Sequence, residues 1–251
     1  SFLEAGIIHS GKRNNMRKFK PGKPMTVFVV FFFPVLLALG AWQVNRGIEK
    51  QEIWEVHNFQ KSQPVIDELE VLGMNNSEAI YRSVFLEGRF GEETYLLDNR
   101  TYRQEAGYEV FTIFRTAEKN SYLVNRGWVS KNKIDIKNET KESKSTSIEG
   151  IYSPFRRFGL DLSEAVVSSS WPKVVQELDF DIASFDLGLD LKRVVIQLSA
   201  ASEHAYEPIW QPAEFNPSRH FGYAVQWFGL ALVLIISFMY FGFKKEEDDF
   251  K

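Results

Sequence analysis

The chain has 251 residues, a length that allows one large domain or two small ones. Its formal net charge of −3 is too small to indicate a nucleic-acid partner. Cysteine is absent, which excludes disulfides, thiolate metal sites and cysteine nucleophiles. The apolar residues are concentrated near the two ends, and this asymmetry is typical of a membrane protein with terminal anchors.

The first apolar run, Met25 to Val44, carries no charge and is long enough to cross a bilayer as a helix of about 30 Å. Pro34 lies inside the run, and membrane helices tolerate proline. A buried core helix and a cleaved signal peptide are the alternatives. No small-x-small cleavage site follows the run, since Trp42 and Gln43 come at its end.

Residues 45–218 are predicted to form one antiparallel β-rich α+β domain that is large enough to bury its own core. Alternating apolar residues predict strands at Tyr81–Glu87, Thr94–Leu97, Tyr108–Phe114, Tyr122–Val129, Thr146–Tyr152 and Arg193–Leu198. Helices are expected at Gln51–Gln60, as a continuation of the first span, and at Phe180–Leu187. Asp98-Asn99 predicts a turn, and Lys131–Ser147 predicts a polar loop.

The second apolar run, Phe221 to Phe243, is also uncharged. Lysine and arginine flank the outer ends of both runs, at Lys12, Arg13, Arg17, Lys18, Lys20, Lys23, Lys244 and Lys245. This distribution predicts that both termini are cytoplasmic and that the middle domain is extracytoplasmic. The predicted parts are a tail at 1–24, a transmembrane helix at 25–44, the domain at 45–218, a transmembrane helix at 219–243 and a tail at 244–251.

The domain shows no enzymatic signature. G-x-S-x-G, H-E-x-x-H, P-loop and G-x-G-x-x-G motifs are all missing from the sequence. The four histidines, His9, His57, His204 and His220, do not have the spacing of a metal-binding pair.

The second span opens with a group of polar aromatic side chains. His220, Tyr223 and Trp227 share one helical face. One interpretation is structural, with His220 reaching the membrane interface inside an aromatic belt. The other is functional, because a neutral imidazole is a common axial ligand of haem iron.

The end of the first span is predicted to lie at the same membrane face as His220, which would bring Gln43 and Arg46 close to it if the helices pair. Arg46 and Arg219 would then suit the carboxylates of haem propionates. Alternatively, Arg46 only anchors its helix at the lipid headgroups.

Four sequence blocks resemble the Surfeit locus protein 1 family. They are L-G-x-W-Q-x-x-R from Leu39 to Arg46, a weaker block at Gly107-Tyr108, V-N-R-G-W-V at Val124–Val129 and R-H-x-x-Y-A-x-x-W-F from Arg219 to Phe228. The resemblance covers about residues 25–243. Ser130 and Glu49 depart from it, because the family often has proline and an aromatic residue there.

The resemblance implies a non-enzymatic assembly factor of cytochrome c oxidase that promotes insertion of haem a into subunit I. Subunit I and haem a synthase are the implied partners, together with the lipid bilayer. The implied haem-binding residues are Trp42, Gln43, Arg46, Arg219, His220, Tyr223 and Trp227, with His220 as the iron ligand. A scaffold that carries no haem is the alternative. The short N-terminus, which is not rich in serine, favours a bacterial over a mitochondrial inner membrane.

Overall fold

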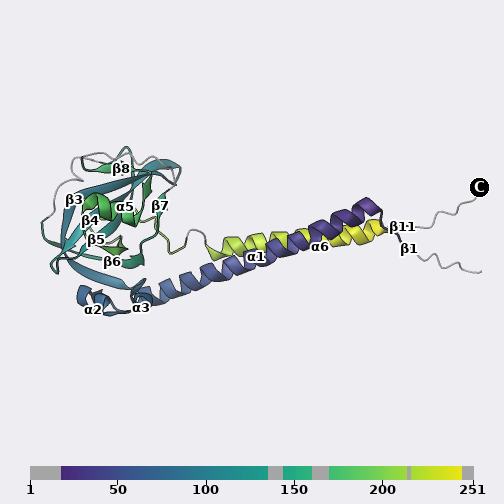
Figure 1. The fold of residues 1–251 in the computed structure, drawn as a ribbon, viewed down its shortest axis with the longest axis horizontal. Helices are drawn as coiled ribbons and strands as arrows, with labels where there is room; N and C mark the ends of the chain where they lie inside the picture. The colour runs from purple at the N-terminus through teal and green to yellow at the C-terminus, as the bar shows by residue number, and fades with distance from the viewer. Residues whose placement is uncertain (1–17, 135–143, 160–169, 214–215, 245–251) are drawn as a thin grey trace, which may run out of the picture. The chain divides into compact units, whose positions relative to one another are not determined.

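A computed structural model of the chain describes residues 18–134, 144–159, 170–213 and 216–244 (Figure 1). The chain divides into two compact units, Ser1–Gln51 with Phe215–Lys251, and Glu52–Glu214. Most of both predicted tails, and residues 135–143 of the predicted polar loop, lie outside the described residues. The helices are α1 (Lys23–Ser62), α2 (Glu68–Gly73), α3 (Asn76–Ala79), α5 (Phe180–Leu187) and α6 (Pro217–Gly242).

The second unit is built on one large sheet. Its strands are β2 (Ile66–Asp67), β3 (Ser83–Tyr102), β4 (Glu105–Thr116), β5 (Ser121–Ser130), β6 (Thr146–Pro154), β8 (Lys173–Val175) and β10 (Leu191–Leu198). Two further strands, β7 (Phe158–Gly159) and β9 (Glu177–Leu178), pair with each other. The pairings run β3-β4-β5-β10-β6, and β6 pairs again with β3, so these strands close into a five-membered ring.

The predicted all-antiparallel pairing is wrong in part, because the sheet is mixed. β5 and β10 are parallel, as are β2 with β3 and β8 with β3. The parallel β5–β10 pair follows from closure. Strand directions cannot alternate all the way around a ring with an odd number of members, so at least one neighbouring pair must be parallel. The other four pairs of the ring are antiparallel.

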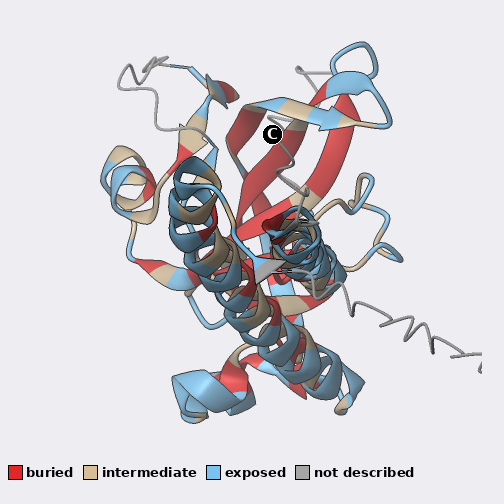
Figure 2. Ribbon diagram, turned by 90° about the vertical axis from the view of Figure 1, so that its right-hand side faces the viewer, coloured by how far each residue is buried: buried red, intermediate tan, exposed pale blue. Residues whose placement is uncertain are grey.

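The central strands are buried on both faces, as Figure 2 shows by their red colour. Successive residues of β5 point to opposite faces, so Tyr122 and Val124 join one hydrophobic cluster and Leu123 joins another. The second cluster includes Ala183 of α5. This two-sided burial explains why β5 reads as a continuous apolar run rather than a strict alternation.

β3 is a single strand of 20 residues, whereas the sequence pattern predicts two short strands. The predicted turn at Asp98-Asn99 is wrong. The pairing of β3 with β4 only shifts register between Leu97 and Arg100, with Asn99 at φ 60°. The chain reverses instead at Arg103-Gln104, where both residues have positive φ, as a two-residue hairpin requires.

The helices agree more closely with the sequence. α1 continues past the first apolar run to Ser62, which confirms the predicted extension through Gln60, and α5 spans the predicted range. α1 and α6 are both long and apolar enough to cross a membrane. Only 11% of each apolar window is buried within the described chain, unlike the core helix of a soluble protein.

The outer ends of α1 and α6 are joined in the first unit. β1 (Lys18–Phe19) pairs antiparallel with β11 (Phe243–Lys244), and the amide of Lys20 donates to the carbonyl of Gly242 at 2.8 Å. The ring of Phe19 packs edge-on against Phe238 at 5.4 Å. The start of α1 and the end of α6 therefore lie side by side.

The V-N-R-G-W-V block forms part of β5 and contains a bulge. Gly127 has φ +104°, and a Cβ there would lie 2.6 Å from the carbonyl oxygen of Glu207. Trp128 exchanges backbone hydrogen bonds with Glu207, at 2.7 and 3.1 Å. Gly127 therefore permits a close backbone approach that a side chain at this position would prevent.

Gly127→Ala is expected to lower the free energy of unfolding of the protein in detergent by about 2–4 kcal/mol, because it combines backbone strain with overpacking. Gly188→Ala is the matched control, since Gly188 also has positive φ but has no atom within 4 Å of an added Cβ. We expect the control to cost about 1 kcal/mol. Equal losses in denaturant titrations of the two variants would contradict the role given to the Glu207 contact.

Candidate functional site

Small residues allow α1 and α6 to approach closely. A Cβ on Gly40 would lie 2.6 Å from the ring of Phe228, and one on Gly47 would lie 2.7 Å from the ring of Phe221. Ala224 and Ala231 are buried on α6. Each pair is seven residues apart, the repeat that keeps one seam of a helix facing its partner. In the sequence analysis Gly40 appears only as a letter of a motif. Its separation of seven residues from Gly47 could have identified the face of α1 that packs against α6, which we call the seam.

The close approach brings His220 and Gln43 together. Nδ1 of His220 lies 2.9 Å from Oε1 of Gln43, and the imidazole is half-buried. A carbonyl oxygen can only accept, so Nδ1 must carry the proton and donate it. In the neutral imidazole, Nε2 then carries the lone pair that binds a metal. Gln43 thus fixes both the orientation and the tautomer of His220, as the hydrogen-bond partners of ligating histidines do at metal sites.

Arg46 does not join this pair. Its guanidinium Nη1 lies 2.7 Å from Oε2 of Glu49, one turn further along the same helix. Glu49 is one of the two residues that depart from the family pattern, and here its carboxylate pairs with Arg46. Arg219 lies exposed in the first turn of α6, where Asn216 caps the helix by accepting from the amide of Ser218 at 3.0 Å.

The aromatic residues of the predicted site differ in burial. Tyr223 is 48% exposed and Trp42 is 54% exposed, whereas Trp227 is half-buried. Ala224, directly after Tyr223, is the residue that faces the other helix. Tyr223 and Trp42 therefore present their rings mainly to the surroundings of the helix pair rather than to its seam.

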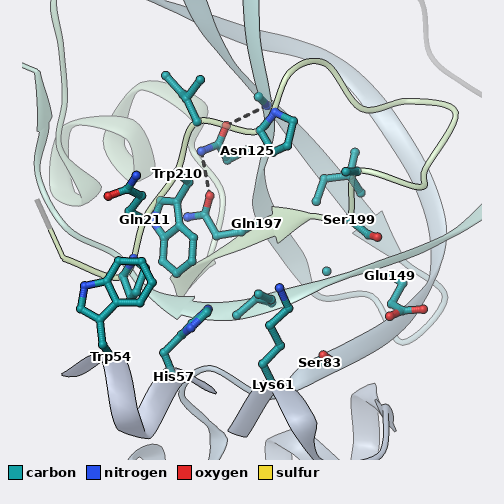
Figure 3. Close-up of a pocket in the computed structure, with 18 residues that line it drawn as sticks. Trp54, His57, Lys61, Ser83, Asn125, Glu149, Gln197, Ser199, Trp210 and Gln211 are labelled. Carbon is teal, nitrogen blue, oxygen red and sulfur yellow. Dashed lines mark hydrogen bonds between the residues drawn. The ribbon is translucent and has the colours of Figure 1, made fainter. Parts of the chain in front are cut away.

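The second unit contains a separate cavity of about 440 Å³, which we call the His57 cavity. Its lining includes Trp54, His57, Lys61, Asn125, Gln197 and Trp210. The first three come from the last turns of α1, and Figure 3 shows His57 and Lys61 reaching from this helix toward Trp210 and Asn125. Among the described residues, no three histidine, aspartate or glutamate side chains group as a metal site.

The floor of the His57 cavity is a hydrogen-bonded amide network. Nδ2 of Asn125 donates to Oε1 of Gln197 at 2.7 Å (Figure 3). It also donates to Oε1 of Glu109 at 2.8 Å, and Gln197 donates to Ser153 at 2.9 Å. Arg100 pairs with Glu109 at 2.9 Å. Buried polar groups that are all partnered in this way rigidify a core. Asn125 of the V-N-R-G-W-V block is therefore structural.

His57 is only 6% exposed. Its Nδ1 donates to Oδ1 of Asn58 at 3.3 Å, so Nε2 is the acceptor nitrogen, and within the described chain it is buried without a hydrogen-bond partner. Leaving such a group unsatisfied costs about 1–3 kcal/mol. Burial lowers the pKa of His57, the positive charge of Lys61 lowers it further, and the Asn58 hydrogen bond opposes both.

Gly40→Ala is expected to lower the thermal unfolding temperature of the detergent-solubilised protein, because the new methyl group must displace the Phe228 ring at a cost of about 1–3 kcal/mol. Gly229→Ala makes the same chemical change on α6, where no atom lies within 4 Å of the added Cβ. The control should leave the unfolding temperature unchanged or raise it. A destabilised Gly229→Ala with an unaffected Gly40→Ala would rule out the proposed seam.

Acid is expected to destabilise the second unit through His57. The folded protein keeps this imidazole neutral, whereas the unfolded chain takes up a proton near the ordinary pKa of about 6.5. The contribution of His57 to the free energy of unfolding is therefore fully present above the unfolded pKa. It is lost as the pH falls from that pKa toward the lowered pKa of the folded state. The drop in unfolding temperature between about pH 7.5 and about pH 5.5 should be smaller in His57→Gln than in the wild type. An identical drop would argue against a buried neutral His57.

Comparison with known proteins agrees with the sequence blocks. A family model described as the SURF1 family matches residues 30–232, a range that includes both Gln43 and His220. A SURF1-like protein of Rickettsia conorii is 28% identical over 223 residues, which cover 85% of this chain and 90% of that protein. A SURF1-like protein of Rickettsia felis is 29% identical over 220 residues, which cover 84% and 93%. The resemblance is confirmed, and the chain belongs to the SURF1 family.

Proposed function

We propose that this chain is a non-enzymatic assembly factor of cytochrome c oxidase that carries haem a as cargo to subunit I. Haem a synthase is the proposed source of the cargo. Both long apolar helices cross a bacterial inner membrane in this proposal, with the two termini in the cytoplasm. The pairing of β1 with β11 supports that topology, because it holds the outer ends of α1 and α6 together.

The hydrogen bond between His220 and Gln43 is the observation that carries the proposal. It selects the imidazole tautomer in which Nε2 is the metal-binding nitrogen. The helix pair would thus suit a haem, because haem iron binds a neutral imidazole. Arg219 lies one residue before His220 and is exposed, so it supplies a positive charge for a propionate.

Arg46 has a smaller role in this proposal than the sequence suggested. Its guanidinium already pairs with Glu49, and a propionate would have to compete with that carboxylate. Trp227 is the aromatic residue best placed to cover part of the porphyrin, because it is half-buried on the face of α6 that carries His220. Tyr223 and Trp42, which are about half exposed, would face lipid or the edge of the cargo.

The test is an absorption spectrum of the protein purified from cells that make haem a. The wild type should co-purify with haem, and His220→Ala should lose it. Gln43→Leu should weaken haem affinity about 10-fold or more, because Nδ1 loses its acceptor. Gln43→Glu should retain haem, because a carboxylate also accepts from Nδ1.

Gln226→Leu is the matched control, since Gln226 is an exposed glutamine on α6. Haem content equal to the wild type in His220→Ala would remove His220 as the ligand. Co-purification of subunit I with no haem at any stoichiometry would favour the scaffold alternative. Conversion of one haem type to another by the pure protein would favour an enzyme.

A further inference from the structure

The His57 cavity has the properties of a small-molecule site that is independent of the haem proposal. Its volume of about 440 Å³ falls within the range of ligand pockets, and its residues all belong to the second unit. Its walls are aromatic and its floor is polar. The amides of the floor already form hydrogen bonds within their own network. They therefore shape the cavity, and a ligand would have to bind to the other lining side chains.

Two ring nitrogens of the cavity lining are buried without a hydrogen-bond partner in the described chain: Nε2 of His57, an acceptor, and the Nε1–H donor of Trp54. Nδ1 is held by Asn58, so Nε2 presents a lone pair, and no donor reaches it from the described residues. A metal ion bound by protein side chains does not fit, because the described chain groups no further histidine or carboxylate ligands around it. The complementary group is an organic donor, of which a hydroxyl is the simplest.

The surroundings of the imidazole favour a planar molecule. Ring centroids lie 5.7 Å away for Trp210, 6.2 Å for Trp54 and 5.4 Å for Tyr81. Figure 3 shows the indole of Trp210 directly beside the imidazole, at the cavity. Aromatic rings prefer offset or edge-on partners, and this cluster offers both ring faces and ring edges. Nε2 has almost no solvent-exposed surface, so the side chains around the imidazole have to shift for a ligand to reach it.

We propose that the His57 cavity binds a planar aromatic molecule that bears a hydroxyl group, such as a phenol or a hydroquinone. The O–H donates to Nε2 of His57, and the ring packs between Trp54 and Trp210. Lys61, which is exposed at the cavity, selects against cationic ligands. Nothing in this assignment depends on His220, so either proposal can fail alone.

The matched probes are 2-naphthol and 2-methoxynaphthalene, which share a ring system but differ in the O–H donor. The 251-residue chain is labelled with ¹⁵N-histidine, purified without haem and titrated in detergent with each probe. Its four histidines give few resonances, and the one lost in His57→Phe identifies His57. The ¹⁵N shift reads the hydrogen bond directly and does not respond to partition of the probes into micelles.

We expect 2-naphthol to move the His57 Nε2 resonance saturably and 2-methoxynaphthalene to leave it in place. His57→Phe should weaken 2-naphthol binding about tenfold, the value of one hydrogen bond, and leave binding of the ether unchanged. Trp210→Ala should weaken both probes. An unmoved Nε2 resonance, or equal binding of the two probes by the wild type, would overturn the proposal. Comparing the affinities of the two probes for the wild type needs no variant, so this part of the test holds even if His57→Phe does not fold.

Discussion

Closure of the sheet into a ring with five members is the constraint on which the second unit depends. An odd ring forces one parallel contact, and the chain places it between β5 and β10. That contact sets Asn125 directly beside Gln197 in the register. Their side chains then bond each other and continue to Glu109 and Ser153. A fully antiparallel arrangement would leave the ring open and the amides without these partners.

The helix pair depends on a different constraint, which is the presence of glycine on α1 where the two helices touch. Gly40 and Gly47 let the rings of Phe228 and Phe221 lie against the backbone of α1. In the membrane setting that we propose, lipid tails are as apolar as these rings, so close packing rather than burial from water would hold the helices together. The same close approach lets Gln43 reach His220, so the seam and the candidate ligand arise from one geometry.

Local features of the fold could be predicted from the sequence, and contacts distant in the chain could not. α5 and the extension of α1 follow from helical periodicity alone. The hairpin at Arg103-Gln104 was missed because neither residue is a usual hairpin residue, whereas Asp98-Asn99 is a common turn pair that here forms a bulge. Ring closure depends on β3 pairing with β6, about 60 residues away, and no pattern within either strand encodes it.

The two histidines that matter most differ in how visible they are in a sequence. His220 belongs to one recognisable block and its partner Gln43 to another, so the motifs alone are enough to indicate the pair. His57 lies in a polar helical stretch with no motif. Its character comes from Trp210 and Tyr81, which reach it from other parts of the chain, and from the burial that they impose. A buried acceptor is a property of the fold rather than of the sequence near it, so sites of this kind have to be found in three dimensions.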